Sequence, residues 1–126
     1  MDNMEKYSTE SKLEIIKQLA KEKKAENIIS IDVSDVSNLT DRIIICSGEG
    51  TMHTRAIGKY IIETTKKMYM IMHHQEGIQN GTWILLDFGD VVLHIFDRTA
   101  REFYKLEDFW KELTERVKSD LPELTK

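Results

Sequence analysis

Asp87, Asp90 and His94 are the side chains whose types and spacing could bind a divalent metal ion. Carboxylate oxygens and imidazole nitrogens are common metal ligands, and Asp87 and His94 fall on one face of a predicted hairpin. Asp90, however, falls in the turn of that hairpin, where aspartate is favoured for conformational reasons. We therefore interpret these residues as turn chemistry plus a hydrogen-bonded histidine, and we predict neither a metal site nor a cofactor.

The other histidines and the glycine-rich turn give no stronger indication of catalysis. His73 and His74 are adjacent, so on a strand their side chains would point to opposite faces. Residues 47–50 precede a predicted helix with His53 near its start, and such a helix start could hold an anion. This turn lacks the phosphate-loop pattern, and Glu49 would repel a phosphate. We therefore predict an ordinary turn, in a protein that is not an enzyme.

Length, composition and charge limit the classes of protein that remain. The chain has 126 residues, of which 40% are hydrophobic and 32% charged, which predicts one globular domain over 1–126. The single cysteine, Cys46, follows three isoleucines, so we expect a buried, inert thiol. No apolar window could span a membrane and no targeting peptide is recognised, so we expect a cytoplasmic protein. A net charge of −4 argues against general nucleic-acid binding and favours a basic protein partner.

The hydrophobic periodicity predicts the elements that must position these residues. Helices are expected over 9–26, 52–68, 98–104 and 106–118, with Ser8 or Thr9 capping the first and Thr51 the second. Strands are expected over 28–33, 42–46, 83–88 and 91–96, and residues 69–72 could begin another. Pro122 is expected to mark the exit into a short tail over 119–126. This order predicts an α/β (α+β) domain with a mixed sheet flanked by helices, and it leaves the strand order open.

The hairpin over 83–96 carries the most informative pattern. A two-residue loop at Gly89-Asp90 places six apolar side chains on one face, which belongs to the core. The opposite face pairs Trp83 with Phe96, Leu85 with His94, and Asp87 with Val92. This face is apolar but also carries an indole, an imidazole and a carboxylate. Either helices cover it and satisfy the polar groups, or part of it is an exposed binding patch with aromatic anchors. Periodicity leaves both interpretations open.

Motifs along most of the chain resemble those of the ribosomal silencing factor (RsfS, Iojap) family. In the C-terminal half they are Gly81, Trp83, Asp87, Gly89-Asp90, His94, Phe96, Arg101, Phe103, Tyr104, Leu106, Glu107 and Trp110. In the N-terminal half they are Asp32-Val33, Thr40-Asp41, residues 45–48, His53, residues 55–57 and Glu76-Gly77. The resemblance covers residues 9–118. Departures occur at Arg42 and in the turn at Glu49-Gly50, outside the hairpin.

The resemblance implies a function by steric exclusion. Members of this family bind the large ribosomal subunit through the fourteenth protein of its L series, block subunit joining and repress translation under nutrient limitation. It further implies a nucleotidyltransferase-like fold, no catalysis or cofactor, no membrane or specific nucleic-acid sequence as partner, and a homodimer. The residues we expect to contact the partner are Trp83, Leu85, Asp87, His94 and Tyr104. Trp83 would be the anchor, Leu85 its apolar neighbour and Asp87 a contact to a basic group, while Gly89 and Asp90 would shape the turn.

Two alternatives follow from the same observations. The first is a metal-dependent nucleotidyltransferase-like enzyme or nucleotide binder. Such enzymes need a Gly-Ser or Gly-Gly turn followed by two acids one residue apart. Here Ser47-Gly48 has the reverse order, and Asp87 and Asp90 are three residues apart on a hairpin, so the fold alone does not imply the activity. The second is a dimeric scaffold in which the hairpin face is only a dimer interface.

Overall fold

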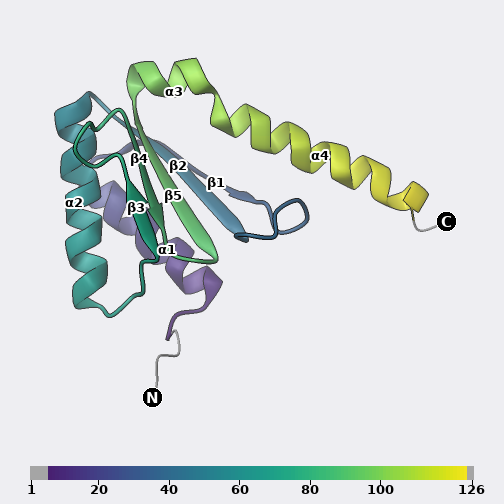
Figure 1. Cartoon of the computed structure of the whole chain (residues 1–126), viewed down its shortest axis with the longest axis horizontal. Coiled ribbons are helices and arrows are strands. Elements are labelled where there is room, and N and C mark those ends of the chain that lie inside the picture. Colours follow the sequence, from purple (N-terminus) through teal and green to yellow (C-terminus); the bar gives the residue numbers. More distant parts are fainter. Residues whose placement is uncertain (1–5, 125–126) are drawn as a thin grey trace.

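The computed structural model describes the backbone of residues 6–124 and the side chains of residues 6–118. The described elements are α1 (Thr9–Glu22), β1 (Glu26–Asp32), β2 (Arg42–Gly48), α2 (Thr51–Lys67), β3 (His74–Glu76), β4 (Trp83–Asp87), β5 (Val91–Asp97), α3 (Arg98–Tyr104) and α4 (Leu106–Leu124). The strands form one sheet in the order β1-β2-β5-β4-β3 (Figure 1). Strands β2 and β5 are parallel and the other neighbours antiparallel. The predicted mixed-sheet α+β fold is confirmed.

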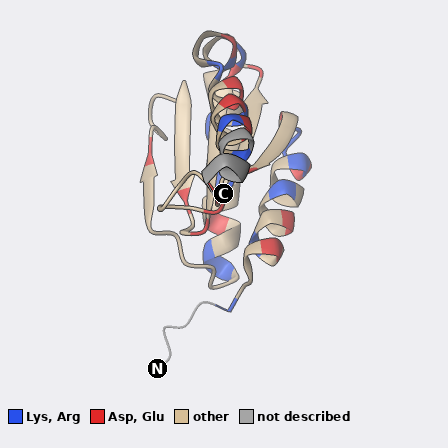
Figure 2. Ribbon diagram, turned by 90° about the vertical axis from the view of Figure 1, so that its right-hand side faces the viewer, with Lys and Arg blue, Asp and Glu red and all other residues tan. Residues whose placement is uncertain are grey.

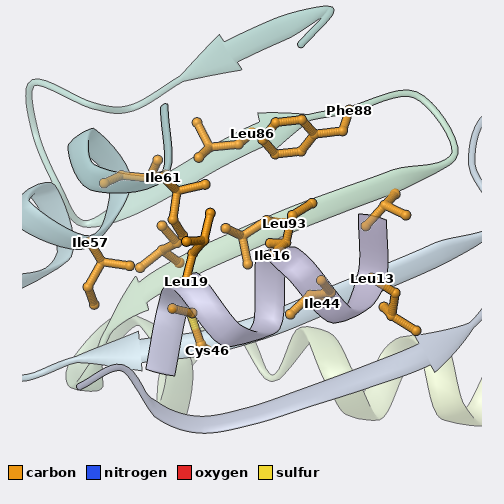
Figure 3. Close-up of a cluster of buried hydrophobic side chains, with 14 of the residues drawn as sticks. Leu13, Ile16, Leu19, Ile44, Cys46, Ile57, Ile61, Leu86, Phe88 and Leu93 are labelled. Carbon is orange, nitrogen blue, oxygen red and sulfur yellow. The ribbon is translucent and has the colours of Figure 1, made fainter. Parts of the chain in front are cut away.

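The main core lies between one face of the sheet and the helices α1 and α2. Ile16 of α1 and Ile57 and Ile61 of α2 are fully buried there against side chains of β2, β4 and β5 (Figure 3). Helix α1 exposes most of its charged residues on the other side, because its apolar residues recur at helical spacing; Lys12 is the buried exception. Figure 2 shows that Lys, Arg, Asp and Glu gather mainly on the helices and connections, while the strands carry few of them.

Strand β2 is buried on both faces, as its apolar run predicts. Ile43, Ile44, Ile45 and Cys46 are all at most 2% exposed. Ile44 and Cys46 belong to the main core, whereas Ile43 and Ile45 belong to a second cluster on the opposite face. Strand β2 lies between β1 and β5 and therefore has a hydrogen-bonded neighbour on each side.

Helix α3 and the start of α4 cover only part of that second face. Leu106 and Trp110 pack against the cluster that contains Ile31, Ile43 and Phe96. Beyond this contact α4 leaves the body of the domain (Figure 1). None of the helices in the part of the chain that the structure describes has both the length and the apolar composition of a membrane span. The second face is thus covered over β1 and β2 and less completely over β4.

Several element boundaries differ from the sequence predictions. Helix α1 ends at Glu22 instead of residue 26, because Lys24 adopts a positive φ of 62° and the Ala25 N–H donates to the Ala20 carbonyl. The N-cap of α2 is Gly50, so the prediction that Thr51 is the cap is wrong. Helix α4 extends to Leu124, beyond Pro122, where we expected the chain to leave the helix.

The prediction of a strand beginning over 69–72 is also wrong. Tyr69 has a positive φ of 60°, and the Met70 N–H closes the end of α2 by donating to the Thr65 carbonyl at 2.9 Å. The strand instead lies at His74–Glu76, where the sequence pattern predicted mostly loop. All three of its residues are exposed, so an edge strand of this length has no alternation that periodicity could detect.

Candidate functional site

The hairpin of β4 and β5 has the predicted register, with Trp83 opposite Phe96, Leu85 opposite His94 and Asp87 opposite Val92. Its second face is neither fully covered nor open. Phe96 is fully buried and His94 is 8% exposed, while the other four side chains are half-buried. We call Trp83, Leu85, Asp87, His94 and Tyr104 the hairpin patch. Trp83, Leu85, Asp87 and His94 share one face of the hairpin, and Tyr104 of α3 contacts Trp83. Asp87 lies at the turn end of this face, away from α3.

The end of the hairpin patch next to α3 consists of aromatic rings. The ring of Trp83 lies 4.8 Å from that of Phe96 and 4.7 Å from that of Tyr104, centroid to centroid. Phe103 contacts Tyr104 edge-on at 4.9 Å and is itself 76% exposed, although it was not among the predicted contacts. Aromatic side chains with half-exposed rings are typical anchors of protein interfaces.

A cavity of about 330 Å³ lies beside Trp83 and Leu85, with Glu76 and Gly77 as its other walls. Gly77 has a φ of 82°, and a Cβ atom there would lie 2.0 Å from the carbonyl oxygen of Trp83. Only glycine permits this approach of the β3–β4 connection to β4. The cavity therefore depends on the glycine at this position, and an apolar side chain of another molecule could enter it.

His94 is a neutral, hydrogen-bonded residue in this site. The indole N–H of Trp83 donates to its Nδ1 at 3.0 Å. Burial lowers the pKa of the His94 imidazole from 6.5 to about 4. Asp87 is engaged as well, since its Oδ1 accepts the Gly89 N–H at 2.8 Å. Among the described residues no group of three or more His, Cys, Asp or Glu side chains could hold a metal ion.

The lowered pKa of His94 predicts a specific dependence of stability on pH. The unfolded chain binds the proton more tightly, so the free energy of unfolding should fall as the pH drops from about 6.5 to about 4. The full penalty is about 3 kcal/mol. Urea denaturation at a series of pH values measures this slope, and a His94→Gln variant should lack this contribution. Equal slopes for the two proteins over this window would contradict the assignment.

Asp90 does more than shape the turn. Its carboxylate accepts hydrogen bonds from the Thr9 hydroxyl and from Lys12 Nζ, the latter at 2.8 Å. The Lys12 side chain is only 4% exposed, and its Nζ also donates to the Phe88 carbonyl at 2.9 Å. This ion pair ties α1 to the β4–β5 turn, and the sequence analysis missed it. A signal was available, because Lys12 lies one turn before Ile16 and therefore on the buried face of the helix.

Arg101 and Glu107 fix the corner between α3 and α4, where Tyr104 lies. The Arg101 guanidinium donates to Glu107 Oε1 at 3.1 Å and to Ser47 Oγ at 2.8 Å. Lys105, between the two helices, has a positive φ of 48°. The corner is thus joined to the end of β2, which keeps Tyr104 against Trp83.

The turn before α2 is occupied by contacts within the protein. The Glu49 N–H donates to His53 Nδ1 at 2.9 Å, and Nε2 of the same ring lies 2.8 Å from the Lys23 carbonyl oxygen. Arg55 donates to the Gln79 carbonyl. These side chains connect loops, which agrees with an ordinary turn. Cys46 is fully buried, as predicted, and burial raises the pKa of its thiol to about 12.

Comparison with known proteins gives a consistent result. Residues 6–126 match the family model described as ribosomal silencing factor during starvation. The ribosomal silencing factor RsfS of Bacillus subtilis is 32% identical over 98 residues, which are 78% of this chain and 83% of that protein. The same factor of Haemophilus influenzae is 36% identical over 87 residues, 69% of this chain and 85% of that protein.

A solved structure agrees with these matches. The crystal structure of a Chromobacterium violaceum protein superposes with a TM-score of 0.81 at 25% identity, covering 83% of this chain and 88% of that one. The family match spans nearly all of the chain, including both strands of the hairpin and the corner at Arg101. The chain belongs to the ribosomal silencing factor (RsfS) family.

Proposed function

We propose that this chain binds the large ribosomal subunit through the fourteenth protein of its L series, and that the hairpin patch is the contact surface. The observation that carries this proposal is the incomplete cover of one sheet face. Leu106 and Trp110 pack over β1 and β2, yet Trp83 and Leu85 stay only half-buried beside a cavity. Large apolar side chains left in this state favour a protein partner.

Each side chain of the hairpin patch has its own role in binding the partner. Trp83 acts as the anchor, and the rings of Phe96 and Tyr104 pack against it. Leu85 and the cavity receive an apolar group. The second oxygen of Asp87 remains for a basic group of the partner, since Oδ1 already accepts from Gly89. The chain's net charge of −4 speeds the encounter with a basic ribosomal protein.

The mechanism is steric and needs no cofactor. A bound copy occupies the surface at which the large subunit meets the small one, so the two cannot join, and translation in the cytoplasm falls when nutrients are short. The description of the family as ribosomal silencing factors supports a role without catalysis. A homodimer through the same aromatic patch is the second candidate, because an exposed aromatic surface also suits a symmetric interface. An unchanged oligomeric state in a folded Trp83→Ala variant would count against it.

A subunit-joining assay tests the proposed function. Purified large subunits are first incubated with the protein, small subunits are then added, and joined ribosomes are measured by sedimentation. We expect joining to fall as the protein approaches one copy per large subunit. Adding the protein to the small subunits first should give the same final level at equilibrium, because the protein and the small subunit compete for one face of the large subunit. Undiminished joining at saturating protein would refute the proposed steric block.

A further inference from the structure

His94 lies near the centre of the hairpin patch although only 8% of it is exposed. Its neighbours across the strands are Leu85 on β4 and Ile45 on β2. The rings of Trp83 and Phe96 lie 5.9 and 6.3 Å from its own ring, centroid to centroid. The imidazole is therefore held in one orientation by apolar groups on several sides.

The hydrogen bond with Trp83 determines which nitrogen of His94 carries the proton. An indole N–H can only donate, so the Nδ1 atom that receives it at 3.0 Å must be an unprotonated acceptor. Burial keeps the ring neutral by lowering the pKa of His94 to about 4. A neutral imidazole with a bare Nδ1 carries its proton on Nε2. His94 thus presents an N–H donor at the far end of its ring.

Among the described residues this N–H donor has no acceptor. The one side-chain hydrogen bond that His94 makes with them is the bond that its Nδ1 accepts from Trp83. Side chains of a sheet stand roughly perpendicular to it, so Nε2 lies farther from β5 than Nδ1 does. It therefore points toward the side of the sheet that the helices cover incompletely. Buried donors are nearly always paired in proteins, because an unpaired one is costly.

We propose that Nε2–H of His94 donates a hydrogen bond to an acceptor oxygen of the partner that docks on the hairpin patch. His94 is then a specificity-determining residue: Trp83 and Leu85 supply apolar contact, and His94 requires an oxygen at one fixed position. A lysine or arginine side chain of the partner cannot meet this requirement, because it has no acceptor. The matching group is a carbonyl, hydroxyl or carboxylate oxygen. This inference rests on the proposed function.

Two amide substitutions separate the two nitrogens of His94. In His94→Asn the side-chain oxygen can replace Nδ1 as the acceptor for Trp83, but no atom reaches the position of Nε2. In His94→Gln the longer amide can donate from near the position of Nε2. Binding to isolated large subunits should weaken roughly tenfold for the Asn variant, as for the loss of one buried hydrogen bond. The Gln variant should stay within about threefold of the original protein.

The outcomes distinguish this inference from the function on which it rests. If Leu85→Asp abolishes binding while His94→Asn binds like the original protein, the donor role is refuted and the docking surface remains. Equal losses for Asn and Gln would also refute it, because binding would then not depend on a donor near the position of Nε2. If the original protein does not bind large subunits, the proposed function itself fails.

A measurement on the unmodified protein does not depend on the variants folding. Nitrogen-15 NMR of the imidazole ring reports the protonation of each nitrogen directly. We expect His94 to be protonated at Nε2 and bare at Nδ1 in the free protein. A proton on Nδ1 would overturn the inference without any substitution.

Discussion

Replacing Asp90 with alanine is expected to lower the free energy of unfolding by about 3 kcal/mol, within the range found when one partner of a buried ion pair is removed. The reason lies with Lys12, whose side chain is only 4% exposed and would lose the carboxylate that pairs with it. The Thr9 hydroxyl would lose its acceptor as well. Urea denaturation at neutral pH measures the change.

The matched variant is Lys12→Met, which removes the other half of the ion pair. The Asp90 side chain is 30% exposed, so water can solvate the remaining carboxylate, and methionine fills the apolar space along α1. We expect a loss of about 1 kcal/mol, clearly smaller than for Asp90→Ala. A larger loss for Lys12→Met than for Asp90→Ala would contradict this account of the ion pair.

The same ion pair contributes to acid sensitivity. Desolvation raises the pKa of Asp90, but the hydrogen bonds from Lys12 and Thr9 outweigh it, so the net pKa lies below the ordinary 3.8. A carboxyl with a lowered pKa stabilises the fold above about pH 3.8 and loses this contribution as the pH falls further. This window lies below that of His94, so the two effects can be separated in one titration.

Replacing Leu85 with aspartate is expected to weaken binding to the large subunit at least about 30-fold, the equivalent of about 2 kcal/mol at an interface hot spot. The change places a charge beside Trp83 and the cavity, where a docked partner would exclude water. Leu85 is half-buried in the free protein, so the substitution could also destabilise the fold. The melting temperature of the Leu85→Asp variant must therefore be measured alongside binding.

Met52→Asp is the control for this prediction. Met52 is 78% exposed and lies in the first turn of α2, which packs on the opposite face of the sheet. An acid in the first turn of a helix is favourable, so this variant should keep its stability. It adds the same charge and should bind like the original protein. Equal losses for the two variants would show that added negative charge, and not the patch, decides binding.

The parts of this fold that rest on local alternation could be predicted from the sequence. The register of the hairpin follows from a two-residue loop and the period of two, and it places Trp83 opposite Phe96 as observed. The burial of β2 follows from its unbroken apolar run, Ile43 to Cys46. Both features are encoded within a few neighbouring residues.

The contacts that sequence reasoning missed join residues far apart in the chain. Lys12 meets Asp90 across 78 positions, and Arg101 meets Ser47 across 54. Nothing local distinguishes these charged residues from solvated ones, except that Lys12 shares a helix face with Ile16. The bond from Trp83 to His94 could have been anticipated from the hairpin, because the two are diagonal neighbours on one face.

The central claim is that the chain binds the large ribosomal subunit through the hairpin patch. Co-sedimentation with isolated large and small subunits tests it most directly, with the Asp87→Asn variant alongside. Asparagine keeps an oxygen for the Gly89 N–H, so the turn should persist while the charge is lost. We predict that the protein sediments with the large subunit alone, and that Asp87→Asn does so more weakly at an unchanged melting temperature. Sedimentation with neither subunit, or equally with both, would contradict the account.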